Sequence, residues 1–328
     1  MKNTEIPRIQ LGFFPTPLHK LENLTRYFGG PQIYVKRDDM TGLALGGNKT
    51  RKLEYLIGDA LKQNCNCLIT GGAEQSNHCR QTAAAAAMSG LECHLALRGE
   101  EPEEYTGNLL LNKLFNAKFH WSKQYRKGEN IPLIAEELKA FGKNPYIIPY
   151  GGSNFVGAIG YVEAINEITK QIIEQKIKID HTIFASSSGG THAGMIAGKT
   201  LYNLGSDLIG VQIDKDEAGD KPFTQLIIDL ANEVSSKLLI KKTHTQMDVI
   251  LRSDFIENEY GVVGDLERSA IKLLAEKEGV LVDPVYTGRV FGGIIRMIEN
   301  KEFSKDETIL FWHTGGAPSL FSYSKELI

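Results

Sequence analysis

Short apolar segments alternate along the chain with longer segments of helical period. The short segments are rich in β-branched and aromatic residues and are flanked by glycine or charged residues, as buried strands are. They cover residues 32–36, 67–72, 93–99, 145–150, 181–188, 207–214 and 307–316. Helical periods cover residues 50–63, 79–90, 155–175, 195–204 and 266–279. This alternation predicts an α/β fold with mostly parallel sheets that helices cover on both faces.

The chain has 328 residues, which is enough for two units of this kind. The glycine-containing segment 149–157 is the best candidate for a crossing between them. We therefore predict a small α/β unit over residues 46–156. Residues 1–45 and 157–328 are expected to form a second, larger α/β unit.

Charge and hydropathy exclude several classes of partner. Lys and Arg number 37 and Asp and Glu number 40, which gives a net charge of -3 and predicts no binding to nucleic acid or to an anionic membrane. No apolar run approaches the roughly 20 residues that cross a bilayer. The N-terminal segment lacks the apolar centre of a secretory signal. A cytoplasmic protein is expected.

The cysteines and histidines do not predict a disulfide framework or a metal site. The chain has four cysteines, and one residue separates Cys65 from Cys67, which is unlike the usual zinc spacing. His192 and His313 lie in glycine-containing turns without a partner at metal-ligand spacing. We expect buried thiols in a reducing compartment and no metal.

Glycine-containing turns follow several of the predicted strands. They are LALGGNK, ITGGAEQSN, IPYGGSN, SSSGGTHAG and HTGGAPS. In open α/β sheets, ligands bind beyond the carboxyl ends of strands, where helix N-termini present backbone N–H groups. A set of such turns predicts that a ligand is held from several sides.

The segment GLALGGNKTRK, residues 42–52, raises the question of what Lys49 does. In a nucleotide-binding P-loop the lysine directly follows the second glycine, but Asn48 separates Gly47 from Lys49. The chain also lacks a G-x-G-x-x-G after a strand and a G-x-S-x-G elbow, which disfavours dinucleotide-binding and α/β-hydrolase folds. Lys49 is then either a nucleophile or the start of a basic helix.

Two further segments have the composition of binding sites. Residues 186–194 follow a strand and enter a helix, so their backbone N–H groups are suited to bind phosphate, although a tight turn requires the same glycines. Gln75, Ser76, Asn77 and His78 lie where a helix begins, and such polar residues are suited to bind a carboxylate, although Ser76 or Asn77 is otherwise a helix cap. Tyr260 and Tyr286 are acid–base candidates or apolar filling.

In an ordered set of segments the chain resembles the D-cysteine desulfhydrase and 1-aminocyclopropane-1-carboxylate deaminase family. The segments are FPTPL, VKRDD, GGNKTRKLEYL, QSNHCRQTAAAAA, SSSGGTHAG, EYG, DPVYTG and HTGGAPSLF, and they extend from about Phe14 to Tyr323. The resemblance implies a tryptophan-synthase-β-like fold, pyridoxal phosphate fold type II. Two open twisted, mostly parallel sheets flanked by helices are expected, with the cofactor in the large unit and the chain in a homodimer.

The resemblance implies that Lys49 forms the Schiff base with pyridoxal 5′-phosphate. Lys52 is its basic neighbour, one helical turn away. A lysine of this kind must lose its proton, and burial, a nearby cation and a helix N-terminus all disfavour the ammonium form. Lys49 is thus expected to be a covalent anchor and a candidate base for the α-proton.

The resemblance also assigns the remaining site residues. Asn77 is expected to bind the phenolic oxygen of the cofactor, and Ser76, with Gln75 and Asn77, to receive the substrate carboxylate. Tyr260 and Tyr286 are expected to flank the substrate. The phosphate is assigned to the backbone N–H groups of Ser188, Gly189, Gly190 and Thr191.

Two threonines favour one activity within the family. Thr287 and Thr314 stand where the resemblance implies glutamate and leucine in the deaminases. A hydroxyl near the pyridine nitrogen does not hold a proton there as a carboxylate does, which suits expulsion of a thiolate better than cleavage of a carbon–carbon bond. D-cysteine desulfhydrase, giving pyruvate, hydrogen sulfide and ammonia, is therefore predicted.

Three alternatives remain open. They are 1-aminocyclopropane-1-carboxylate deaminase, which gives 2-oxobutanoate and ammonia; a sulfo-lyase acting on cysteate; and a pyridoxal phosphate carrier or sensor without turnover. Glu74 stands where the resemblance implies an apolar residue. If this carboxylate faces the substrate, it changes which amino acid binds.

Overall fold

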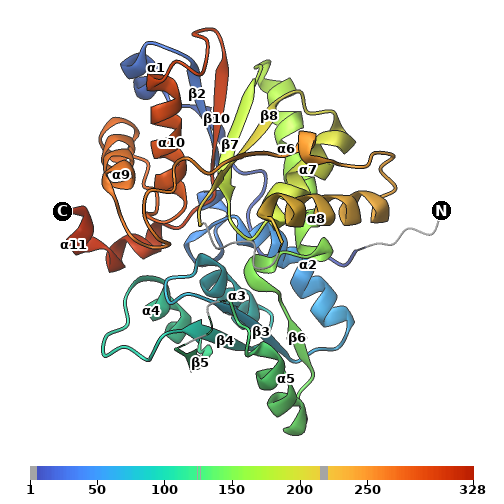
Figure 1. Ribbon diagram of the computed structural model, residues 1–328. Helices are drawn as coiled ribbons and strands as arrows, with labels where there is room; N and C mark the ends of the chain where they lie inside the picture. Colours follow the sequence, from blue (N-terminus) through green and yellow to red (C-terminus); the bar gives the residue numbers. More distant parts are fainter. Residues whose placement is uncertain (1–5, 124, 126, 215–220) are drawn as a thin grey trace.

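The computed structural model describes residues 6–123, 125, 127–214 and 221–328, and the strands in this part of the chain form two sheets (Figure 1). The six-stranded sheet has the order β1 (Leu18–Lys20), β2 (Gln32–Arg37), β10 (Thr308–His313), β7 (His181–Ser186), β8 (Asp207–Gln212) and β9 (Ile250–Arg252). The four-stranded sheet has the order β5 (Lys118–Ser122), β4 (Glu92–Arg98), β3 (Cys67–Gly72) and β6 (Pro145–Ile147). Among the strand pairs formed by the described residues, only β1–β2 is antiparallel.

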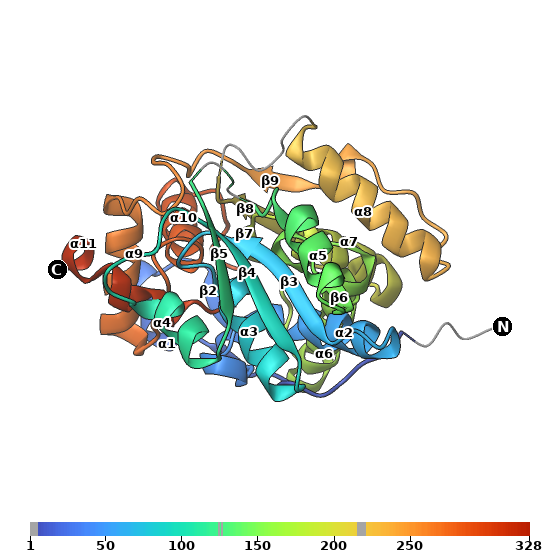
Figure 2. The same ribbon diagram turned by 90° about the horizontal axis from the view of Figure 1, so that it is seen from below.

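Helices connect the strands and cover the sheets. They are α1 (Glu22–Phe28), α2 (Lys49–Lys62), α3 (Asn77–Met88), α4 (Gly107–Leu114), α5 (Ile131–Ala140), α6 (Phe155–Gln175), α7 (Gly190–Tyr202), α8 (Phe223–Lys237), α9 (Asp265–Glu278), α10 (Thr287–Glu299) and α11 (Ser324–Leu327). In Figure 1, α1, α9 and α10 lie to one side of the six-stranded sheet and α6, α7 and α8 to the other. Figure 2 shows the four-stranded sheet from below, in front of the larger one.

Strand β10 shows why the large sheet is covered on both faces. Its side chains alternate between two cores: Ile309 and Phe311 pack in the core with α1, α9 and α10, whereas Leu310 and Trp312 pack in the core with α6, α7 and α8. All four are completely buried. A parallel strand between two layers of helices therefore has a continuous apolar sequence.

The fold-class prediction is confirmed, because both sheets are mostly parallel and flanked by helices. The sequence prediction missed β1, β5 and β9, which all lie at sheet edges. Edge strands are short or only partly buried, so they lack a long apolar run. Helices α1, α4, α5, α8 and α10 were also missed. Strand β6 ends at Ile147, earlier than predicted, because Pro149 has no N–H and a 3₁₀ turn, Tyr150–Gly152, follows.

The division into two units stays a prediction. The strands of the small sheet and α3, α4 and α5 fall within residues 46–156, but α2 of that segment packs against α6. Residues 1–5 of the predicted large unit lie outside the described residues. Among the described helices, none has both the length and the apolar composition that a bilayer crossing requires.

Candidate active site

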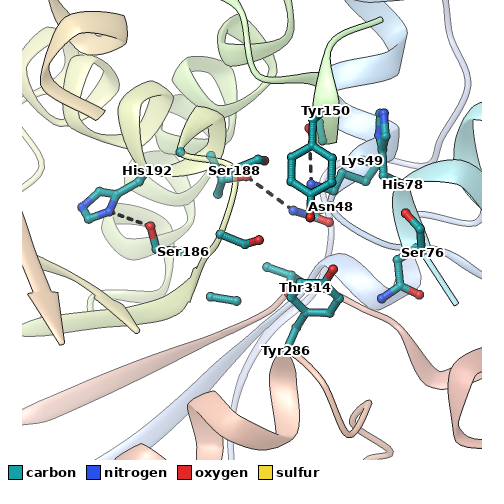
Figure 3. A pocket seen from close by; sticks show the side chains of 16 residues that line it. Asn48, Lys49, Ser76, His78, Tyr150, Ser186, Ser188, His192, Tyr286 and Thr314 are labelled. Carbon is teal, nitrogen blue, oxygen red and sulfur yellow. Dashed lines mark hydrogen bonds between the residues drawn. The ribbon is translucent and has the colours of Figure 1, made fainter. Parts of the chain in front are cut away.

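A cavity lies where loops from both sheets meet (Figure 3). Most of the residues predicted for the site line it, namely Lys49, Ser76, Asn77, Ser188, Gly189, Thr191, Tyr286 and Thr314. Four others are not among the described residues that line it, namely Gln75, Gly190, Tyr260 and Thr287. His78, one of the polar residues predicted at the start of the helix, lines it too. No role was predicted for Asn48, Tyr150 or Gly151, which also line it.

Lys49 is the first residue of α2 and lines the cavity. The glycine turn before it packs closely against the glycine turn that follows β10, because an added Cβ at Gly315 would lie 2.6 Å from Gly47 Cα. The N–H of Asn48 donates to Thr314 O at 2.9 Å, which joins the α2 entry to the end of β10. Gly47 has a φ of 134°, and an added Cβ there would lie 2.4 Å from Gln81 Nε2. Glycine is therefore required at position 47, two residues before the lysine.

Two lysines meet at one backbone carbonyl. Lys49 Nζ donates to Gly151 O at 3.3 Å and Lys52 Nζ donates to the same oxygen at 3.0 Å. Lys52 is buried, and burial, together with the charge of Lys49, holds its pKa well below the usual value. His78 beside them is kept uncharged, because burial and then the two lysines hold its pKa well below its usual range. This environment disfavours positive charge.

The entry to α7 forms the opposite wall of the cavity. Gly189 has a φ of 82°, and the N–H of Gly190 donates to Ser153 Oγ at 3.1 Å, which in turn donates to Ser188 Oγ at 2.7 Å. Lys52 Nζ lies 2.9 Å from the position of an added Cβ at Gly190. A lysine and a helix N-terminus thus meet at one point. This combination fits the phosphate of pyridoxal phosphate.

Gly151 lets the backbone approach Ser188 and Lys49 closely at this wall. An added Cβ at Gly151 would lie 2.1 Å from Ser188 Oγ and 3.4 Å from Lys49 Nζ, so a side chain there would fill the space between them. His192 contacts Ser186 Oγ through Nδ1 at 3.1 Å, and burial lowers its pKa to about 3. The His192 imidazole is therefore uncharged, and the donors toward this wall are the lysine amines and the N–H groups of the helix N-terminus. Within the described residues, no group of His, Cys, Asp or Glu is arranged to bind a metal.

The start of α3 serves two purposes. Ser76 caps the helix, because its Oγ accepts from the N–H of Cys79 at 3.2 Å, and it also lines the cavity. Gln75 turns away, because its Nε2 donates to Thr106 O at 3.1 Å. Glu74 does not face the cavity; its carboxylate lies beside Gly99, where an added Cβ would be 2.8 Å away.

Tyr260 and Tyr286 form a pair at the cavity edge. Their hydroxyl oxygens are 2.5 Å apart, and their rings meet edge to face with centroids 6.0 Å apart. Tyr286 lines the cavity, and Tyr260 contacts Tyr286 through its hydroxyl and its ring.

The two threonines have different surroundings. Thr314 lines the cavity, whereas Thr287 is occupied by Asp283. The Thr287 hydroxyl accepts from the N–H of Asp283 at 2.8 Å and donates to Asp283 Oδ2 at 2.7 Å. Of the two hydroxyls predicted near the cofactor ring, only that of Thr314 belongs to a cavity-lining residue.

Comparison with known proteins identifies the family. A family described as "Pyridoxal-phosphate dependent enzyme" matches residues 9–315. The chain belongs to this family. Because the members of this family are pyridoxal-phosphate dependent enzymes, two predictions are confirmed: the cofactor, and that the chain is an enzyme. A protein named D-cysteine desulfhydrase from Salmonella newport (strain SL254) is 44% identical over 326 residues, which are 98% of this chain and 97% of that protein. One from Salmonella choleraesuis (strain SC-B67) matches with the same identity and coverage.

Two solved structures share the fold of this chain. One, titled as an ACC deaminase homologue, has a TM-score of 0.89 and 37% identity over 98% of this chain and 96% of its own. O-ureido-L-serine synthase has a TM-score of 0.67 and 15% identity, covering 95% of this chain and 92% of that one. This likeness concerns the fold alone. The predicted resemblance and fold type are confirmed.

Proposed function

We propose that this chain is a pyridoxal-phosphate dependent D-cysteine desulfhydrase. It would convert D-cysteine and water to pyruvate, hydrogen sulfide and ammonia by β-elimination. The observation that carries this proposal is the 44% identity to proteins named D-cysteine desulfhydrase over 98% of the chain. Thr314 at the cavity, where leucine is expected in the deaminases, supports it.

Residues on both sides of the cavity would hold the cofactor. Lys49 is the proposed covalent anchor, Asn77 the partner of the phenolic oxygen, and the residues from Ser188 to Thr191 the phosphate site. Lys52 would add an amine donor at the α7 entry, where its Nζ approaches Gly190, and a bound phosphate would favour the protonated form of this amine. Bound there, pyridoxal phosphate would withdraw electrons from the α-carbon of an attached amino acid.

The other residues would position the substrate and move protons. Ser76 and Asn77 would receive the substrate carboxylate at the α3 N-terminus. The Lys49 amine would take the α-proton. Tyr286, supported by Tyr260, would hydrogen-bond to the substrate at the cavity edge.

The test supplies D-cysteine and L-cysteine separately to the purified holoenzyme and measures sulfide and pyruvate. Equal amounts of both products from D-cysteine, with little from L-cysteine, are expected. β-Chloro-D-alanine should also give pyruvate, because chloride is a good leaving group. No sulfide from D-cysteine would overturn the proposal.

The second candidate is 1-aminocyclopropane-1-carboxylate deaminase. The structure titled as an ACC deaminase homologue favours it, with 37% identity and a TM-score of 0.89. Formation of 2-oxobutanoate from the cyclopropane acid would identify this activity. Sulfite release from cysteate would instead identify a sulfo-lyase.

Replacing the two tyrosines separates their roles. Tyr286→Phe is expected to lower kcat for sulfide release from D-cysteine by about tenfold to a hundredfold, because a hydroxyl at the cavity is lost. Tyr260→Phe should cost about tenfold or less, since Tyr260 acts through Tyr286. Steady-state kinetics measures both. Tyr202→Phe removes a tyrosine hydroxyl bonded to Glu163 at 3.0 Å, away from the cavity, and should match the unchanged chain. A larger fall in kcat for Tyr260→Phe than for Tyr286→Phe would contradict the proposal that Tyr260 acts through Tyr286.

A cytoplasmic homodimer completes the proposal. The family resemblance supports a dimer, and the near-neutral net charge of -3 supports a small amino-acid substrate over nucleic acid or a membrane surface. Light scattering on the purified holoenzyme measures the assembly, and a mass of one chain would contradict it.

A further inference from the structure

A buried asparagine outside the cavity contacts two of the predicted site residues. Asn108, in the first turn of α4, is completely buried. Its N–H donates to Gln75 Oε1 and its Nδ2 donates to Gln75 O, both at 2.8 Å. The same Nδ2 donates to Asn77 Oδ1 at 2.8 Å. Asn108 therefore holds both the backbone before α3 and the side chain of Asn77.

Arg80 fixes which way the Asn108 amide is turned. Arg80 Nη1 donates to Asn108 Oδ1 at 2.9 Å. A guanidinium group has donors and no acceptor, so only the oxygen of Asn108 is able to face it. The Nδ2 of Asn108 is then turned toward Asn77, which must present its own oxygen in return. The direction of each amide follows from the one before it.

Arg80 is itself held firmly. It is completely buried in α3, and its Nη2 donates to Gly46 O at 2.6 Å, three residues before Lys49. Burial lowers its pKa to about 10, with Asp283 acting in the opposite direction, so the group stays charged at neutral pH. This cation connects the glycine turn before Lys49 to the Asn108–Asn77 pair.

We infer that Asn108 is a positioning residue that turns the Asn77 amide so that its N–H₂ end serves the cofactor. Asn77 lines the cavity, and its Oδ1 is taken by Asn108, so Nδ2 is the end that remains to donate to a group bound there. An added Cβ at Gly316 would lie 2.7 Å from this Nδ2, which places it at the β10 turn. The inference rests on the proposed roles of Asn77 and Lys49.

The consequence is chemical and not only structural. A donor beside the phenolic oxygen stabilises negative charge on it and makes the adjoining imine nitrogen less basic. If the Asn77 amide turned over, its oxygen would face that charge. The pKa of the Lys49–cofactor imine would then rise, and the cofactor would bind less tightly.

The hydrogen bonds from Arg80 to Asn108 and from Asn108 to Asn77 are called the relay below. Asn108→Asp reverses the second of them while keeping the shape of the side chain. The carboxylate still accepts from Arg80, now as an ion pair, but it has no donor for Asn77. Asn77 is expected to turn over and donate to the new carboxylate. We expect the imine pKa, followed by absorbance against pH in the holoenzyme, to rise by about one unit. Equilibrium dialysis with pyridoxal phosphate should show about tenfold weaker binding.

A second variant and a double variant separate orientation from added charge. Asn108→Ser replaces the amide by a shorter hydroxyl, which adds no charge and both donates and accepts. It should shift the imine pKa upward by less, because Asn77 becomes able to adopt either orientation. In an Asn77→Ala background, Asn108→Asp should cause little further shift, because there is no amide left to turn. Asn112→Ser, one turn along the same helix, changes a buried asparagine whose amide has no partner among the described residues. It should leave the imine pKa unchanged.

The outcomes distinguish this inference from the proposed function. An unshifted imine pKa in both Asn108 variants overturns the relay, and so does an equal shift in the presence and absence of Asn77. A shift that depends on Asn77 supports it whether or not D-cysteine is consumed, because the measurement needs only the bound cofactor. Lack of D-cysteine turnover in the unchanged chain would overturn the proposed function and leave the relay standing.

Discussion

Lys49→Ala is expected to abolish both the covalent link to pyridoxal phosphate and turnover of D-cysteine. The side chain is proposed as the anchor of the cofactor and as the base for the α-proton, so its removal takes away two functions at once. We expect kcat to fall on the order of 10⁴-fold or more. The measurement is sulfide release, together with the absorbance of the lysine-bound cofactor. Lys49 lines the cavity beside Lys52, which is buried and is expected not to replace it.

The control for this experiment lies on the same helix. Lys62 is the exposed last residue of α2, and Lys62→Ala removes the same functional group far along the helix from Lys49. It should keep the activity and spectrum of the unchanged chain. Borohydride reduction and digestion of the unchanged holoenzyme should tag the peptide that contains Lys49. A tag on any other lysine would refute the assignment.

The sequence predicts buried parts of this fold better than partly exposed ones. The strand expected at residues 181–188 is present as β7, because it has helices on both faces and hence a continuous apolar sequence. Strand β5 was missed because it lies at a sheet edge, where none of its residues is fully buried. Local pattern thus reflects how completely an element is buried.

The site was predictable where a short motif carries it and not where packing does. Lys49 follows a glycine turn at the start of α2, and Ser188 lies in the glycine turn between β7 and α7, so their place at the end of a regular element is visible in the chain. Asn108 has no such motif. Its role depends on contacts with residues more than 25 positions away in the sequence, which exist only after α3 and α4 pack together. Thr287 is the reverse case, since its motif is present but Asp283 takes its hydroxyl.

A buried group of charges supports the helix that carries Lys49. Arg51 donates to Asp38 Oδ1 at 2.7 Å and Oδ2 at 2.9 Å, and to Glu167 Oε1 at 2.9 Å. Tyr161 and Trp312 also donate to Asp38 Oδ2, at 2.7 and 2.8 Å. Arg51 thereby ties α2 to α6 and to the end of β2. The Arg51–Asp38 ion pair thus contacts β10 of the large sheet through Trp312 and belongs to the helix that begins with Lys49.

Arg51→Met is expected to destabilise the apoprotein by about 3–5 kcal/mol, because it leaves the completely buried Asp38 carboxylate without its cation. Burial alone would raise the pKa of Asp38, but Arg51 outweighs it and lowers the pKa from 3.8 to about 2. A depressed pKa stabilises the fold fully above the unfolded value and loses its effect as the pH falls toward 2. The variant should therefore lose most stability at neutral pH and little near pH 2. Urea unfolding across this pH range measures the difference.

Arg252→Met is the matched control, because Arg252 also binds two carboxylates, but at the surface. Its side chain is 26% exposed and contacts Asp254 and Glu302, each at 2.6 Å. Exposed ion pairs contribute about 1 kcal/mol or less, since water and salt screen them. The two variants thus remove the same group from similar partners at different depths. A loss in Arg252→Met as large as in Arg51→Met would contradict burial as the cause. A loss in Arg51→Met that persists undiminished at low pH would contradict the role of the Asp38 charge.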